Sequence, residues 1–209
     1  MTNCQTLHKW VHTLPELDFS FTDTSVPANG IYFLFEKGER AHGGNRIVRI
    51  GTHTGEGQLH SRLKQHFLTP NKDRSIFRKN IGRALLARDC DPFLADWELD
   101  LTPRTARELH GARIDAAKQA IVEKRVSAYI RDNFTFAVVR IDEKDERLKL
   151  ESRSISTVSL CPLCTPSASW LGNDSPKEKI RESGLWIVNE LYKEPLSDTD
   201  FTALTGAVL

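Results

Sequence analysis

The sequence predicts an α/β protein of the α+β type, in which a small, mostly antiparallel central sheet is flanked by helices. An apolar run, Gly30–Phe35, and a second strand-like run, Arg46–Gly51, lie close enough together to form a hairpin. A third run, Phe134–Ile141, is rich in β-branched and aromatic residues and lies much later in the chain. Apolar residues recur at helical spacing between and after these runs. We therefore expect a sheet built from the three runs, with helices around it.

The first strand should be the central one. Gly30–Phe35 is an unbroken apolar run that opens on an Asn-Gly turn signal, which is typical of a strand covered on both faces. Arg46–Gly51 follows after a polar, glycine-rich connection, Lys37–Asn45. The two strands are therefore predicted to form an antiparallel hairpin with a loop longer than a tight turn.

A helix is predicted after the hairpin. Leu59, Leu63 and Phe67 recur every four residues and form one apolar stripe. Arg62 and His66 form a second row beside that stripe, because residues four apart share a helix face. The two polar side chains are therefore expected to point the same way.

These segments resemble the GIY-YIG nuclease family. The first family signature is intact at Gly30–Tyr32, the second is altered at Arg49–Gly51, and Arg62 and His66 match the helical Arg-x-x-x-His row. The resemblance implies an α/β nuclease core with a helical insertion. It also implies hydrolysis of DNA phosphodiesters with one divalent metal, held by a glutamate on a later helix. The family usually has a tyrosine where Arg49 stands. Either the arginine takes over a phosphate or phenolate contact, or the site has lost a catalytic element.

Glu151 is the candidate for that glutamate. Asp142–Ser159 is predicted to be a helix, and Glu151 lies three residues after Leu148 and four before Ile155, on the inward face. An ionised carboxylate buried there needs a cation or a metal, or it must be protonated. A structural ion pair is the alternative reading. With the resemblance, we expect Glu151 to hold one Mg²⁺ or Mn²⁺ ion.

The resemblance also implies roles for three side chains of the hairpin and the helix. Tyr32 would activate or position water, although a free phenol has a pKa near 10 and would need a drop of roughly three units to act as a base. Arg62 would bind the non-bridging phosphate oxygens through its planar fork. His66 would position or shuttle a proton near neutral pH.

Two further residues are candidates for the site. His53, in the turn after the second strand, could stand in for the missing tyrosine hydroxyl, although a lone loop histidine is more often merely solvated. The family usually has an asparagine shortly after the glutamate helix. Asn173 fits that order better than Asn189, with the intervening stretch as an insertion.

Positive charge is concentrated in one part of the chain. Eleven lysines and arginines lie between Arg40 and Arg88, against Glu56 and Asp73, which gives +9 there and leaves −8 elsewhere because the whole chain carries +1. Such a sector suits a phosphate backbone, although a solvated charged surface is the plainer reading. The predicted nucleic-acid-binding residues are Arg46, Lys64, Arg74, Arg78, Lys79 and Arg83.

The remaining chain supplies support and no assigned chemistry. A helix is predicted from about Ser75, and another from Thr102 as N-cap to Asp132. Gly184–Asn189 has the composition of a further strand. At 209 residues with 39% apolar composition, the chain suits one domain over 1–209. It would have a packing arm at 1–28, a helical insertion at 90–132 and a tail at 195–209.

Targeting signals and disulfides are not expected. The chain has no run of about 18 apolar residues and no secretory leader, which predicts a cytoplasmic protein without a membrane span. The four cysteines do not form a disulfide framework and are read as reduced thiols. Cys161 and Cys164 form a CxxC pair, but a zinc site needs two more ligands and none is near in sequence.

Three functions fit these patterns. A metal-dependent DNA endonuclease acting on double-stranded DNA comes first, with a homodimer as one option for its assembly. A nucleic-acid-binding protein with a decayed site comes second, and a metal-free scaffold or interaction protein comes third. The sequence does not separate DNA from RNA as the substrate.

Overall fold

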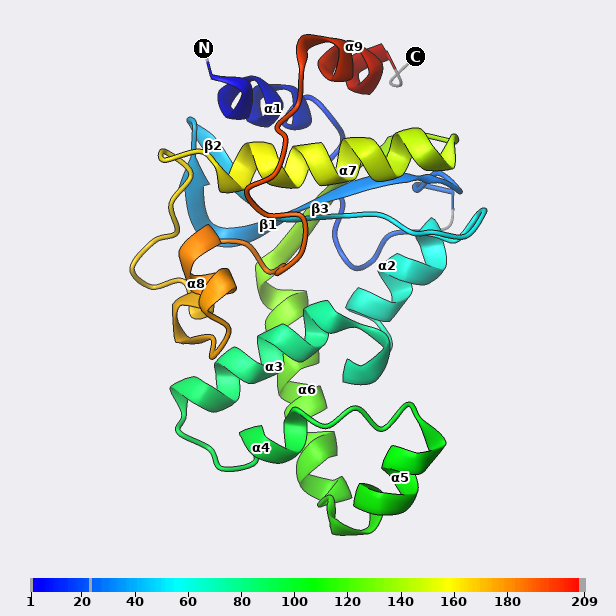
Figure 1. Cartoon of the computed structure of the whole chain (residues 1–209), viewed down its shortest axis with the longest axis vertical. Coiled ribbons are helices and arrows are strands. Elements are labelled where there is room, and N and C mark those ends of the chain that lie inside the picture. Colours follow the sequence, from blue (N-terminus) through cyan, green and yellow to red (C-terminus); the bar gives the residue numbers. More distant parts are fainter. Residues whose placement is uncertain (1, 23, 207–209) are drawn as a thin grey trace.

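A computed structural model of the chain describes residues 2–22 and 24–206. Its sheet has three antiparallel strands in the order β2-β1-β3 (Figure 1). The strands are β1 (Gly30–Ala41), β2 (Gly44–Gly51) and β3 (Phe134–Arg140). The helices are α1 (Asn3–Val11), α2 (Leu59–Phe67), α3 (Ile76–Arg88), α4 (Leu94–Trp97), α5 (Arg104–His110), α6 (Ala116–Asn133), α7 (Lys144–Ser159), α8 (Glu178–Ser183) and α9 (Asp198–Gly206). The predicted fold class is confirmed.

The first strand is central, as predicted. Tyr32 pairs with Gly51 on one side and with Val138 on the other. The strand is longer than its apolar run, however, because it continues to Ala41 through a register shift after Phe35. The predicted polar connection is therefore mostly strand, and the hairpin closes in a tight turn.

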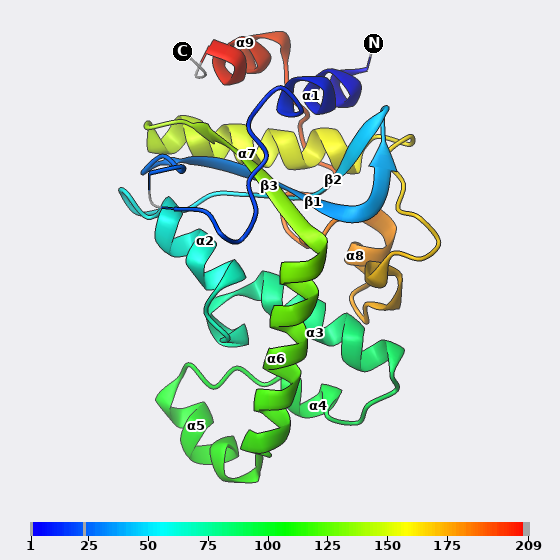
Figure 2. The ribbon, with the colours of Figure 1, turned by 180° about the vertical axis from the view of Figure 1, so that it is seen from behind.

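Helices cover both faces of the sheet (Figures 1 and 2). Tyr32 and Leu34 point into a core shared with α2, α3 and α6, whereas Ile31 and Phe33 point into a second core shared with α1 and α7. This alternation follows from the two-residue period of a strand. The covering of both faces explains why the run from Gly30 has no polar positions.

The helix predicted from Thr102 to Asp132 is wrong. The chain forms two helices there, α5 and α6, separated by a 3-10 turn at Gly111–Arg113 and by extended backbone at Ile114. Asp115 starts the second helix by accepting a hydrogen bond from the backbone N–H of Lys118 (2.9 Å). The stretch has a helical composition throughout, but Asp115 acts as an N-cap inside it and starts a new helix there.

The strand predicted at Gly184–Asn189 is also wrong. Gly184 ends α8 in the left-handed conformation (φ 66°), and the residues after it form an irregular segment. The backbone N–H of Trp186 donates to the carbonyl oxygen of Val48 (2.8 Å), and its indole donates to a carboxylate oxygen of Glu36 (2.8 Å). The apolar residues there fill the core beside β2 and do not extend the sheet.

The helices of the 90–132 segment lie far from α1 and α9 (Figure 1). The α6 helix packs along α3, and the Trp97 indole donates to the carbonyl oxygen of Lys79 (3.0 Å). The N-terminal arm starts with α1, which a capping box at Thr2 opens. Among the described residues, no helix has the length and apolar character needed to cross a membrane.

Candidate active site

A buried hydrogen-bonded chain joins β1 to α2 and α3. The Tyr32 hydroxyl lies 2.8 Å from Nε2 of His66, and Nδ1 of His66 lies 2.7 Å from Oγ of Ser75, the N-cap of α3. Tyr32 and His66 are both 0% exposed. A Cβ atom at Gly51 would lie 2.2 Å from the Tyr32 hydroxyl oxygen, so the glycine makes room for the phenol.

The imidazole of His66 is neutral. Burial lowers its pKa well below the ordinary 6.5, and the neighbouring Arg49, Arg62 and Arg78 lower it further. A neutral imidazole carries one proton, so it accepts one of its two hydrogen bonds and donates the other. His66 therefore holds Tyr32 and the start of α3 in place, and neither ring contacts solvent in this structure.

Arg49 has a structural partner. Its guanidinium donates to the carbonyl oxygen of Trp186 and lies 5.4 Å from the centre of the Phe77 ring. Its Nε atom is buried without a hydrogen-bond partner. Its charge acts on both His66 and Glu151, because it lowers the pKa of each. Arg49 thus adds positive charge behind the site from a buried position.

Glu151 on α7 is half-buried, and its carboxyl group has an unusual pKa. Burial raises the pKa of its carboxyl group from 4.5 to about 7. Arg49, a hydrogen bond from the Thr52 backbone and Arg62 oppose this shift. Glu151 therefore lies near the end of β2 and near α2, and the cations around it do not fully compensate its charge at neutral pH.

An open cleft of about 320 Å³ lies beside these groups. Its lining residues come from the end of β2, the following loop and α2: Thr52, His53, Thr54, Gln58, Ser61, Arg62 and Gln65. The Arg62 guanidinium donates two long hydrogen bonds, to Oε1 of Gln65 (3.4 Å) and to the carbonyl oxygen of Arg74 (3.4 Å). A phosphate oxygen could replace these weak contacts at little cost.

His53 lines the same cleft. Its Nδ1 lies 2.6 Å from the carbonyl oxygen of Gly55, which can only accept, so Nδ1 carries the proton. The unprotonated Nε2 accepts a long hydrogen bond from the backbone N–H of Gly30 (3.4 Å). Burial lowers the pKa of this imidazole, so it is neutral at pH 7. His53 and Arg62 thus line one cleft, and Arg49 and Arg62 lie close enough to Glu151 to lower the pKa of its carboxyl group.

A family model described as GIY-YIG domain matches residues 4–207. The chain belongs to the GIY-YIG family. The match spans nearly the whole chain, so it includes the N-terminal helix and the segment after α7 as well as the hairpin motifs. No curated protein and no solved structure matches the chain. Membership in the GIY-YIG family indicates a nuclease type of function.

Four of the predicted nucleic-acid-binding residues of this GIY-YIG protein are wrong. Arg46 and Arg78 are both 0% exposed. Arg46 is paired with Glu39 (2.6 Å), and Arg78 is paired with Glu123 (2.9 Å). A buried cation that already has a carboxylate partner cannot neutralise a phosphate.

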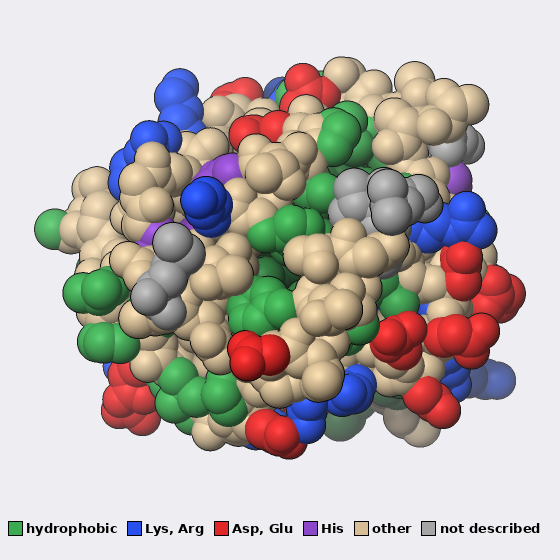
Figure 3. All heavy atoms as spheres, turned by 90° about the horizontal axis from the view of Figure 1, so that it is seen from above, with side chains coloured by type: hydrophobic (Ala, Val, Ile, Leu, Met, Phe, Trp, Pro, Cys, Tyr) green, Lys and Arg blue, Asp and Glu red, His purple; other side chains and the backbone are tan. Residues whose placement is uncertain are grey.

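Lys79 and Arg83 are likewise used inside the protein. Arg83 forms an ion pair with Glu98 (2.6 Å), and Nζ of Lys79 donates to the carbonyl oxygen of Glu98 (2.8 Å). Arg74 is exposed and Lys64 is half-buried. The face over α1 and α9 carries interspersed acidic and basic side chains and no continuous basic patch (Figure 3). The cationic sector of the sequence is therefore largely internal.

Asn173 closes its own loop. Its side-chain amide donates to the carbonyl oxygens of Ser167 (2.9 Å) and Ala168 (3.2 Å). The 3-10 turn that carries it, Leu171–Asp174, packs against α3. In this GIY-YIG protein, both hydrogen bonds that the Asn173 amide donates stabilise its own loop.

The sequence interpretation missed Ser75 as a partner of His66. A serine directly before a helical pattern is an N-cap signal, and Oγ of Ser75 accepts from the backbone N–H of Arg78 (3.2 Å). That signal predicts the cap. The contact with His66 depends on how α2 and α3 pack, which local sequence does not encode.

Proposed function

We propose that the protein is a metal-dependent endonuclease that hydrolyses phosphodiester bonds of double-stranded DNA in the cleft beside β2, α2 and α7. The observation that supports this most is the position of Glu151. A carboxylate with a pKa raised to about 7 lies near Arg62, which lines an open cleft. Perturbed acids in clefts are common at catalytic sites. A structural ion pair would have lowered that pKa instead.

The residues fit one divalent metal ion. Glu151 would hold Mg²⁺ or Mn²⁺ by one carboxylate, with water and a substrate phosphate oxygen in the other positions, which is how magnesium is usually bound. Its raised pKa supports the fit, because a carboxylate that Arg49 and Arg62 leave underneutralised gains from a further positive charge. When bound, such an ion stabilises the charge that develops on the phosphate.

Arg62 binds the scissile phosphate in this proposal. Its guanidinium can form two parallel hydrogen bonds to phosphate oxygens, which a lysine cannot do. Its position on the cleft wall and its two 3.4 Å contacts leave it able to reorient toward a ligand. Exposed Arg74 lies on the same side, since its carbonyl oxygen contacts Arg62, and extends the contact along the DNA backbone.

His53 accepts the proton of the attacking water in this proposal, after its Nε2 exchanges the long hydrogen bond from the Gly30 backbone N–H for one from the water. It is neutral, it lines the cleft, and its Nδ1–H bond to the carbonyl oxygen of Gly55 orients the ring with Nε2 unprotonated. Tyr32 and His66 act as positioning residues, because their buried hydrogen bond fixes α2, and with it Arg62, against β1. This assignment replaces the direct role in water activation that the family resemblance implies for Tyr32.

A DNA-binding protein without cleavage activity is the second candidate. Two observations favour it: Arg49 stands in the position of the second motif tyrosine and is bonded to Trp186, and Tyr32 is out of contact with solvent. Both proposals need DNA in the cleft, so they differ in hydrolysis alone.

Nicking of supercoiled plasmid DNA tests the proposal. The wild-type protein should nick in Mg²⁺ or Mn²⁺, and Glu151→Ala should not. Glu146→Ala is a matched control, because this glutamate is exposed on the same helix. Salt-sensitive binding without nicking in either metal supports the second candidate. The absence of both binding and nicking contradicts both proposals and leaves the interaction protein.

A further inference from the structure

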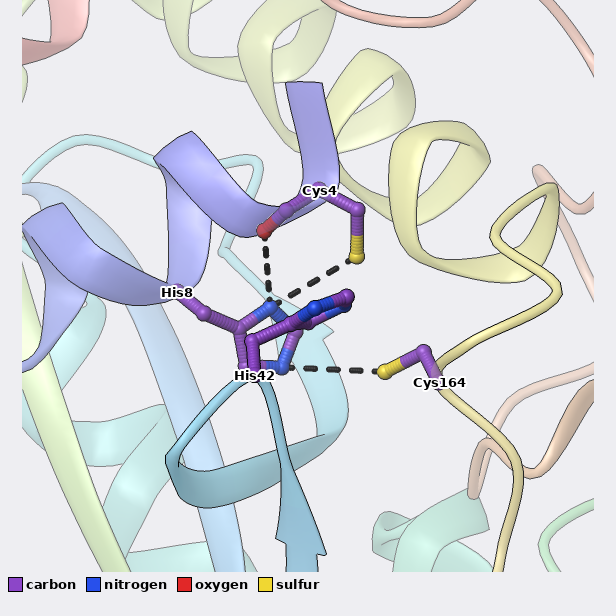
Figure 4. A group of neighbouring side chains, drawn as sticks. All are labelled: Cys4, His8, His42 and Cys164. Carbon is purple, nitrogen blue, oxygen red and sulfur yellow. Dashed lines mark hydrogen bonds between the residues drawn. The ribbon is translucent and has the colours of Figure 1, made fainter. Parts of the chain in front are cut away.

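Four potential metal ligands meet at the other end of the hairpin (Figure 4). Cys4 and His8 lie on α1, His42 lies in the turn between β1 and β2, and Cys164 lies in the loop after α7. One ligand atom from each of the four residues lies within 4.8 Å of the others. Cys4 and His8 share a face of α1 because they are four residues apart.

The separations match a tetrahedral ion with sulfur and nitrogen ligands. Zinc binds sulfur at about 2.3 Å and nitrogen at about 2.0 to 2.1 Å, which places a sulfur and a nitrogen of one tetrahedron about 3.6 Å apart. Sγ of Cys164 lies 3.7 Å from Nε2 of His8, close to that value, whereas Sγ of Cys4 lies 3.6 Å from Nδ1 on the other side of the same ring. The four ligand atoms lie within 4.8 Å of one another, so binding one ion requires the Cys4 side chain to turn toward Nε2.

The cluster lies inside the protein. Cys4, His8 and Cys164 are buried, and His42 is half-buried. A dication at a buried site needs its charge neutralised by its ligands, and two cysteine thiolates supply two negative charges.

His8 is already in the tautomer that a metal ligand needs. Its Nδ1 lies 3.0 Å from the carbonyl oxygen of Cys4, which only accepts, so Nδ1 carries the proton. Its Nε2 is unprotonated and lies 3.7 Å from Sγ of Cys164; it accepts a hydrogen bond from the backbone N–H of Ile47 (3.2 Å), which a bound ion would displace. A backbone carbonyl on the non-ligating nitrogen is the usual way in which metal-binding histidines are oriented.

The turn presents His42 in a conformation that few side chains adopt. His42 has φ 52° and Gly43 has φ 83°, so both central residues of the turn are left-handed. A left-handed histidine is uncommon and is maintained by its surroundings. Its ring packs edge-on against His8 with 4.8 Å between centroids. The strained turn thus aims a second imidazole at the two thiols.

We propose that Cys4, His8, His42 and Cys164 bind one Zn²⁺ ion as a closed structural site. Two sulfur and two nitrogen ligands select zinc among common divalent ions, and four protein ligands leave no position for a substrate. Binding forms two zinc–sulfur and two zinc–nitrogen bonds and releases the thiol protons of the two cysteines to solvent. The ion joins α1, the hairpin turn and the loop after α7, three segments that are far apart in the sequence.

Cys161 stays outside the ligand set. Its Sγ lies 3.5 Å from Nε2 of His42, and it is less buried than Cys164. It is the other half of the CxxC pair, so it is the residue that could replace a histidine ligand. A test of the proposal must therefore separate the two cysteines.

Zinc content of the purified full-length protein tests the proposal. We expect one zinc per chain by elemental mass spectrometry after purification under reducing conditions and gel filtration. Cys4→Ser and Cys164→Ser should lose it, whereas Cys161→Ser should keep it. Cys90→Ser is the matched control, because Cys90 is exposed and remote from the cluster. Glu151→Ala should also keep zinc, which makes this test independent of the nuclease proposal.

Cobalt substitution keeps the test decisive if the cysteine variants do not fold. Wild-type protein that has been stripped and reloaded with Co²⁺ should show the strong visible bands of a tetrahedral ion and thiolate charge transfer. His42→Ala changes a half-buried turn residue, so it should fold and shift these bands. The proposal is overturned by wild-type protein without zinc or a tetrahedral cobalt spectrum. It is equally overturned by a Cys4–Cys164 disulfide in the reduced preparation, or by zinc that depends on Cys161 and not on Cys164.

Discussion

The two sites proposed for the ends of the β1–β2 hairpin are of opposite kinds. At the open end, Arg62 lines an open cleft, and the pKa of the neighbouring Glu151 carboxyl group is raised to about 7. At the turn, the Cys/His cluster is buried and can neutralise a dication with its own ligands. A site that must exchange substrate keeps coordination positions open, whereas a structural site closes them. One hairpin thus supports both kinds of site because its ends face different surroundings.

The largest effect should come from removing the acid of the open end. Glu151→Ala should reduce Mg²⁺-dependent nicking about 10³-fold or more, since a metal typically supplies several kcal/mol of transition-state stabilisation. Its zinc content should not change. Cys164→Ser should show the reverse pattern: it should lose zinc and retain nicking. This comparison is made below the melting temperature of the variant. Measured side by side, equal losses of both properties in either variant would mean that the two ends are not separate.

Two arginines of the same helical region should differ in what they stabilise. Arg78→Ala leaves Glu123 buried and unpaired, so it should lower the free energy of unfolding by about 3 kcal/mol or more. Arg74→Ala should leave the free energy of unfolding nearly unchanged and weaken DNA binding. The slope of log binding constant against log salt concentration should become smaller by about one, because one phosphate contact is lost. Urea denaturation and binding titrations over a salt series measure these effects. Arg104→Ala, exposed on α5, is the surface control. If folded Arg78→Ala protein lost affinity for DNA, Arg78 would have to contact DNA after all, and its assignment as an internal residue would be contradicted.

Protonation of Glu151, at the open end of the hairpin, should make the free energy of unfolding depend on pH. Its pKa is raised from 4.5 to about 7, so between these values the folded protein binds more protons than the unfolded chain. Stability should therefore fall as the pH rises through this window, by at most about 3 kcal/mol without Mg²⁺. Glu151→Gln removes this contribution. Denaturation curves of the two proteins that stay parallel from pH 4.5 to 7 would show that the carboxyl group is not perturbed.

The smallest effect should come from the buried phenol. Tyr32→Phe removes the hydrogen bond to His66 and should cost about 1 to 2 kcal/mol of stability, because the imidazole nitrogen then lacks a partner. As a positioning residue, Tyr32 should affect kcat less than about tenfold, and the pH profile of cleavage should keep its shape. A loss of kcat above 100-fold with unchanged DNA binding would instead assign Tyr32 to water activation.

Sequence patterns correctly predicted the elements that depend on residues within a single segment. The strand Gly30–Phe35, the α2 stripe and the inward face of Glu151 each follow from periodicity, and the structure has β1, α2 and α7 at those places. These features depend on one strand or one helix at a time.

Features that depend on packing between distant segments were not predictable in the same way. Charge counting showed how many lysines and arginines there are, but not that Glu39 and Glu123 would bury two of them. The CxxC pair showed two thiols without the further ligands that zinc needs. Those ligands come from α1 and the hairpin turn, more than a hundred residues away from Cys164, where no spacing rule applies.

The most direct test of two separate metal-binding ends is the activity of zinc-loaded protein as Mg²⁺ is added. Protein that carries one zinc per chain, in buffer free of other divalent ions, should leave supercoiled plasmid intact. Nicking should then rise with Mg²⁺ while the zinc content stays constant, and Glu151→Ala should remain inactive throughout. Nicking by the zinc-loaded protein before any Mg²⁺ is added would contradict the account, as would activity that falls in proportion to zinc removed.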